Sequence, residues 1–165
     1  MKNRQSKYAN SREVPDIIAG VAALVLVTVL VVVGYWITPV LFSELSAQQA
    51  GEIAGTLFIG VSLVVAVMLT GLIGLYLFYK KPLKQVTSVL FALSVMLLLR
   101  IWISPWMQEI KTLYPLGLDK DSVDWPLFAG LHGVYQIGYL LTVLVLLYWG
   151  VRQLLNVRNR RLIDE

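Results

Sequence analysis

Residues 17–43 read IIAGVAALVLVTVLVVVGYWITPVLFS and contain no Asp, Glu, Lys or Arg. A helix needs about 20 largely apolar residues to cross the hydrocarbon core of a bilayer, so this stretch predicts a transmembrane helix. Three further stretches lack charged residues in the same way: 53–79, 85–99 and 125–151. The shortest of them, 85–99, is long enough to cross the bilayer if its helix continues to Trp106 and Arg100 lies near one membrane face.

The composition agrees with a membrane protein. Of the 165 residues, 58% are hydrophobic and 15% are charged, whereas soluble domains carry about 25% charged residues. Backbone groups in lipid must be hydrogen-bonded internally, and the runs are continuously apolar rather than alternating, so helices are expected instead of a β-barrel. We predict an all-α membrane protein, a four-transmembrane-helix bundle, with a tail at 1–15, a membrane domain at 16–155 and a tail at 156–165.

The basic residues lie mainly on one side of the predicted spans. Eleven fall in the two tails, at the end of the fourth span and in the link after residue 79, and three fall on the other side: Arg100, Lys111 and Lys120. Cytoplasmic segments of membrane proteins are enriched in Lys and Arg, so both termini are predicted to be cytoplasmic. This topology explains the net charge of +4 better than nucleic-acid binding, and no nucleic-acid partner is expected.

The first and third predicted helices share a motif. Trp36-Ile-Thr-Pro39 and Trp102-Ile-Ser-Pro105 match the pattern W-I-[S/T]-P at an offset of 66 residues. Proline cannot donate to the carbonyl four residues back, so Pro39 and Pro105 are predicted to be structural kinks. The motif favours two duplicated helical hairpins as much as it favours convergence on a common interfacial pattern.

Glycines are frequent in the second and fourth predicted helices. Gly51-x-x-x-Gly55 is a spacing that lets membrane helices approach closely. We expect it to pack inside the bundle, and self-association into a homo-oligomer or a membrane complex is the alternative.

Polar residues inside membrane spans are costly and are candidates for function. Arg100, His132, Gln136 and Glu52 all fall in the outer half of the predicted spans. One hypothesis is a ligand-binding pocket that is open to the outer side. In it Arg100 would bind a carboxylate or phosphate, His132 would transfer a proton or ligate a metal, and Gln136 would orient the ligand. The alternative is structural: Arg100 reaches the headgroups and His132 donates to a neighbouring helix.

Cofactor chemistry has little support in the residues. The chain has one histidine and no cysteine, so no metal site and no cofactor are predicted, and haem with two axial histidines would require a homodimer. No catalytic motif is present.

The leading hypothesis is therefore a non-enzymatic membrane protein that binds or helps to move a small ligand, or that serves a larger complex. The alternative is a metal- or haem-linked redox protein using His132.

Two segments resemble a known family. They are Pro39-Val-Leu-Phe42-Ser-Glu-Leu45 with the Gln49–Phe58 segment that follows, and Phe128-x-x-Leu131-His132-Gly133. They are similar to the family called domain of unknown function 4149, which is related to transmembrane-protein-205-like proteins. The resemblance implies a bacterial four-helix inner-membrane protein without an assigned activity, and it matches His132 to the histidine of the family's leucine-histidine pair.

Overall fold

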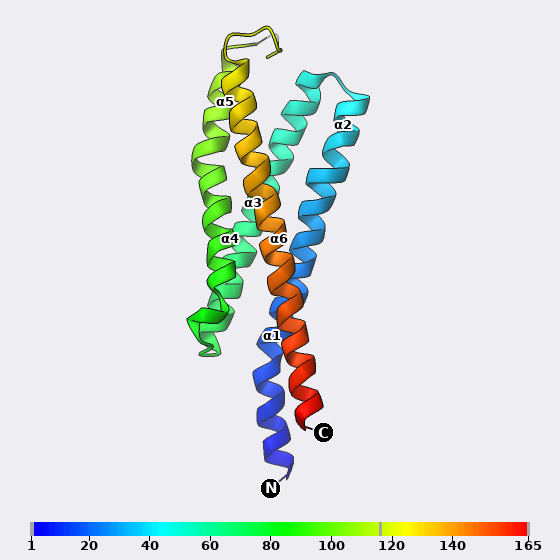
Figure 1. Cartoon of the computed structure of the whole chain (residues 1–165), viewed down its shortest axis with the longest axis vertical. Helices are drawn as coiled ribbons and strands as arrows, with labels where there is room; N and C mark the ends of the chain where they lie inside the picture. Colours follow the sequence, from blue (N-terminus) through cyan, green and yellow to red (C-terminus); the bar gives the residue numbers. More distant parts are fainter. Residues whose placement is uncertain (1, 116, 165) are drawn as a thin grey trace.

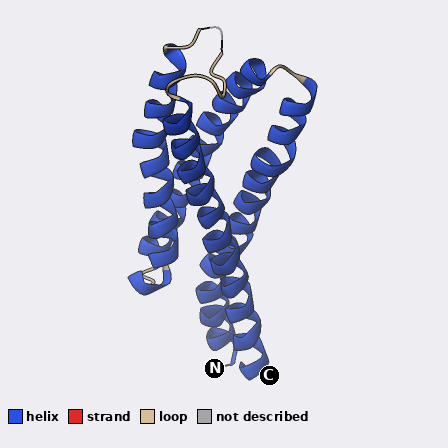
Figure 2. Ribbon diagram, turned by 45° about the horizontal axis from the view of Figure 1, so that its top comes forward, coloured by secondary structure: helices blue, strands red, loops and turns tan. Residues whose placement is uncertain are grey.

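The structure, a computed structural model, describes residues 2–115 and 117–164, with side chains described for 13–115 and 117–162. Its regular elements are all helical within these residues (Figures 1 and 2). They are α1 (Lys2–Val31), η1 (Val32–Ile37), α2 (Thr38–Glu44), α3 (Ala47–Phe78), η2 (Leu83–Gln85), α4 (Thr87–Leu98), η3 (Leu99–Ile103), α5 (Ser104–Thr112) and α6 (Trp125–Asp164).

Four continuous helical segments are long and apolar enough to cross a membrane, which confirms the predicted four-helix membrane fold. They run over Glu13–Glu44, Ala47–Phe78, Thr87–Thr112 and Trp125–Leu162. The outer helices extend beyond the apolar runs, since α1 already begins at Lys2 and α6 continues to Asp164. Pro15 lies inside α1, although proline is better suited to the first turn of a helix.

The chain runs up and down through the bundle. Both termini and the link at residues 79–86 lie at one end, which we call the terminus end (Figure 1). The links at residues 45–46 and 113–124 lie at the other, the loop end (Figure 1). The segments that were predicted to be cytoplasmic therefore share one end of the molecule.

The buried core occupies the half of the bundle nearer the terminus end. Its members from the four helices are Ala19, Ala23, Leu26, Val27, Leu30, Val65, Leu69, Leu72, Tyr76, Val86, Val89, Ala92, Met96, Leu99, Tyr139, Val143, Leu146 and Trp149. Toward the loop end, α2 has no buried residue and α5 buries only Ile110. Both views show α6 and α2 diverging in this direction beyond the crossing of α1 and α6 (Figures 1 and 2).

The closest helix approach is between α1 and α6. A Cβ atom built on Gly150 would lie 3.0 Å from Ala23 Cβ and 3.2 Å from the Gly20 carbonyl oxygen, so only glycine fits there without displacement. Gly51 and Gly55, which were expected to bring backbones together, instead face side chains, those of Lys111 and Gln108.

Both W-I-[S/T]-P motifs adopt the same local conformation. A π-helical segment ends directly before the Ser or Thr in each, at Ile37 and Ile103, and an α-helix follows that carries the proline in its first turn. The Thr38 backbone N–H and hydroxyl both donate to the Val33 carbonyl, which closes the wide turn. A wider turn before the proline relieves the clash of its ring with the carbonyl four residues back, so each helix continues through the proline.

Candidate functional site

Lys111 forms the centre of a polar group at the loop end. The helix continues past Pro105 for two turns, and α5 thereby carries Lys111 to the start of α3. The ammonium nitrogen of Lys111 donates to the Gly51 carbonyl oxygen over 3.3 Å, and Lys111 interacts electrostatically with the Glu52 carboxylate. One helix backbone and one acid therefore hold a half-buried cation in place.

His132 lies next to this cation on α6. Lys111 Nζ is 5.7 Å from the centroid of the Phe128 ring, and that ring stacks on the His132 imidazole at a centroid distance of 6.2 Å. His132 Nε2 is 3.4 Å from Gln136 Nε2, one helical turn further on. The result is a continuous row from α5 and α6, in which the Lys111 cation, the Phe128 ring, the His132 imidazole and the Gln136 amide follow one another.

The structure connects three of the four predicted site residues and leaves one apart. Glu52, His132 and Gln136 are linked through Lys111 and Phe128. Arg100 lies in η3, eleven residues before Lys111, which is about 16 Å along a helix. Its electrostatic neighbour is Tyr135, and it makes no hydrogen bond or ion pair with the other three among the described side chains.

Aromatic rings separate this polar row from the core. Phe58 packs edge-on against Tyr135 and Tyr139, with centroid distances of 5.7 and 5.2 Å. The Tyr139 hydroxyl donates to the buried Leu30 carbonyl over 2.8 Å, which joins α6 to α1. The rings therefore close the core on its loop-end side.

The link between α5 and α6 is ordered by its own side chains. The Tyr114 hydroxyl donates to Asp124 Oδ2 over 2.9 Å, and this hydrogen bond raises the pKa of Tyr114. The Ser122 hydroxyl donates to Asp119 Oδ1 over 2.8 Å, which lowers the pKa of Asp119. The Gln48 amide also donates to the Pro115 carbonyl, so the link is tied to α3 beside the polar row.

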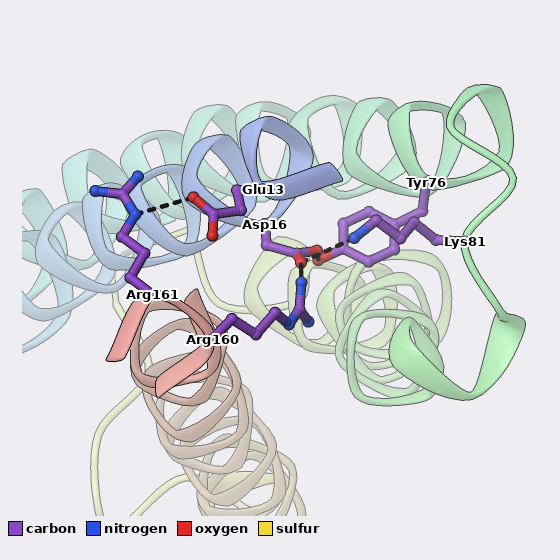
Figure 3. Close-up of polar contacts among 6 residues, drawn as sticks. All are labelled: Glu13, Asp16, Tyr76, Lys81, Arg160 and Arg161. Atoms are coloured by element: carbon purple, nitrogen blue, oxygen red, sulfur yellow. Dashed lines mark hydrogen bonds and ion pairs between the residues drawn. The ribbon is translucent and has the colours of Figure 1, made fainter. Parts of the chain in front are cut away.

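A second polar cluster, at the terminus end, was not predicted (Figure 3). Asp16 is fully buried and accepts from three groups: the Tyr76 hydroxyl at 3.1 Å, Lys81 Nζ at 2.8 Å and an Arg160 guanidinium nitrogen at 3.0 Å. One turn earlier, Glu13 pairs with Arg161 over 2.9 Å. The signal was present in the sequence, since two acids three residues apart precede a long apolar run at the end where most basic residues gather.

The two clusters have different chemistry. At the terminus end each carboxylate is already matched by cations, which is the arrangement of an ion-paired structural contact. At the loop end, Lys111 and the His132–Gln136 pair offer positive charge and hydrogen-bonding groups that a ligand can use. No three His, Asp or Glu side chains come together as a metal site within the described part of the chain.

Comparisons with known proteins give one match. A family model described as "Domain of unknown function (DUF4149)" matches residues 20–114. No curated protein and no solved structure matches the chain.

Proposed function

This chain belongs to the family described as domain of unknown function 4149, and from that premise we propose that it is a bacterial inner-membrane protein that binds a small anionic ligand at the loop end. Its termini face the cytoplasm and the loop end faces outward. The ligand carries a carboxylate or a phosphate, and the protein binds it or helps to move it without transforming it.

The observation that carries this proposal is the position of Lys111. Its ammonium group is half-buried between α3 and α6, and Phe128 connects it to the only histidine of the chain. A cation in a partly desolvated position attracts an anion more strongly than one in water, because the effective dielectric constant is lower. His132 and Gln136 supply hydrogen bonds on the same helix face, since they are four residues apart.

The remaining predicted residues have supporting roles in this proposal. Glu52 holds Lys111 in the absence of ligand, and an incoming anion competes with it for the cation. Arg100 is a second cation nearer the core, beside Tyr135, and it offers the anionic ligand a second binding position deeper in the bundle. Glu52 lies on the loop-end side of the core, and Arg100 follows the core residue Leu99 at its edge.

The outward orientation is supported by the distribution of charge. The link after α3 and the end of α6 carry seven basic residues, and both lie at the terminus end together with the N-terminus (Figure 1). Cytoplasmic enrichment of Lys and Arg then assigns the loop end to the outer side of the membrane.

His132 allows a direct test because it is the only histidine. Purified protein in detergent is titrated with inorganic phosphate and, separately, with succinate, while the ring signals of His132 are followed by nuclear magnetic resonance. We expect a saturable shift with at least one of these anions, and about tenfold weaker binding in Lys111→Gln. Lys120→Gln, which alters an exposed cation of the same end, is the matched control and should bind like the unaltered protein. The proposal would be refuted if neither anion gave a saturable shift, or if Lys111→Gln and Lys120→Gln lost the same amount of affinity.

A further inference from the structure

A cavity of about 170 Å³ lies at the terminus end between α6 on one side and η2 with the first turn of α4 on the other. A single buried water needs only about 10–15 Å³ on the same scale, so the cavity has room for a larger polar group. It is remote from Lys111 and His132, which lie at the loop end, and it is distinct from the ion pairs of Asp16, whose residues do not line it.

The lining is basic and rich in hydrogen-bonding groups. Lys84 and Arg152 contribute the charges, and Thr87 and Ser88 contribute hydroxyls from the first turn of α4. No carboxylate of the described residues lines the cavity. Two cations without an acid among them favour an anion, and hydroxyl and amide donors suit the oxygens of a phosphate.

Gln85, one of the lining residues, has a buried side-chain acceptor that lacks a partner. Trp149 is buried there, and its indole N–H donates to the Gln85 carbonyl over 2.7 Å, which fixes α6 against η2. The Gln85 side-chain oxygen is itself buried and has no hydrogen-bond partner among the described residues. A buried acceptor of this kind costs free energy unless something donates to it, and a turn of the Gln85 amide toward the cavity would let a ligand hydroxyl satisfy it.

Apolar side chains extend from the cavity toward the centre of the membrane. Phe91 lies four residues after Thr87 on α4, and Tyr148 lies four residues before Arg152 on α6, so each shares a helix face with a lining residue. Both are exposed and point away from the bundle core. An acyl chain beside them would continue directly from a headgroup in the cavity.

We propose that this cavity binds the headgroup of an anionic glycerophospholipid whose headgroup carries free hydroxyls. The phosphodiester lies between Lys84 and Arg152, a headgroup hydroxyl donates to the Gln85 side-chain oxygen, and the acyl chains lie along Phe91 and Tyr148. Basic pockets between membrane helices on the cytoplasmic side are a known form of lipid recognition. The site does not depend on the ligand proposed for the loop end.

Native mass spectrometry of the full chain in detergent tests the proposal, with phosphatidylglycerol and phosphatidylcholine as probes. We expect phosphatidylglycerol to bind in preference, and the double variant Lys84→Gln/Arg152→Gln to bind it about 30-fold more weakly, as expected from the loss of two cations near a lipid phosphate. The control is Lys80→Gln/Arg158→Gln, which removes two exposed cations of the same end that do not line the cavity. Circular dichroism establishes that both variants are folded.

Two outcomes would overturn the assignment. Equal weakening of phosphatidylglycerol binding in both double variants would mean that the lipid responds only to the general positive charge of this end. Equal binding of phosphatidylglycerol and phosphatidylcholine would mean that the cavity is not a specific site for an anionic lipid. A third arm separates lipid from soluble phosphate: glycerol 3-phosphate should not displace the lipid at millimolar concentration, and displacement would assign the cavity to a soluble ligand instead.

The hydroxyl contact is tested separately. Gln85→Leu should reduce the preference for phosphatidylglycerol over phosphatidic acid, and an unchanged preference would exclude the hydroxyl contact.

Discussion

Asp16 illustrates what a single residue contributes to this bundle. A carboxylate removed from water is costly, and its charge is retained only when cations and hydrogen bonds compensate for that loss. Here α3, the link after it and α6 each bring one donor to the same carboxylate (Figure 3). Asp16 therefore joins three segments that are far apart in the sequence at the terminus end.

Replacing Asp16 by Asn should destabilise the folded protein markedly. The amide keeps the shape but removes the buried negative charge to which Tyr76, Lys81 and Arg160 donate, and we expect a loss of about 3 kcal/mol in the free energy of unfolding. Denaturant unfolding in detergent, followed by circular dichroism, measures it. Glu13→Gln is the comparison: Glu13 is buried, but it has a single partner, Arg161, which is 58% exposed and stays solvated, so this change should cost less than Asp16→Asn. Equal stability of Asp16→Asn and the unaltered protein would show that the cluster is energetically neutral.

The sequence predicted some of the residues in the loop-end group. His132 and Gln136 were predicted to lie together because positions four apart on one helix are neighbours. The place of Lys111 in the group could not be predicted, since its contact with Gly51 depends on α5 continuing past Pro105 and on the tilt of two helices. Asp16 was missed for a similar reason: its partners come from segments 60 to 144 residues away.

At the level of elements, uninterrupted apolar runs were sufficient to predict three membrane helices, and the third span in chain order required its helix to continue past Arg100, as it does. Their ends were less predictable, because α1 and α6 support one another beyond the apolar runs through side-chain pairs at the terminus end. The π-helical segments before Pro39 and Pro105 end at Ile37 and Ile103, which are separated by the same 66 residues as the sequence motifs. Duplication of a helical hairpin remains a prediction.

The close contact of α1 and α6 makes a further prediction. Gly150→Val should force the two helices apart at Gly20 and Ala23, and overpacking of this kind costs about 1–3 kcal/mol in the free energy of unfolding. The same substitution at Gly74 is the matched control, because a Cβ atom there meets nothing within 4 Å. Thermal unfolding in detergent compares the two. If Gly150→Val is no less stable than Gly74→Val, the contact between α1 and α6 is looser than described.

The whole molecule has a packed half and an open half. The core, the paired carboxylates and the close helix contact all belong to the half nearer the terminus end. Toward the loop end the helices diverge, and polar groups replace the core (Figure 2). This arrangement fits a protein whose helices pack tightly at one membrane face and bind a ligand at the other.

The orientation of these two halves is the central claim, and single-cysteine labelling in intact cells tests it most directly. The chain has no native cysteine, so each introduced thiol reports alone. Cysteines at Ser46 and Ser122, in the links of the loop end, should react with a reagent that does not cross the inner membrane, and one at Asn159 should react only after the membrane is opened. Labelling of Asn159 from outside, with protection of Ser46 and Ser122, would place the loop end in the cytoplasm and contradict the account.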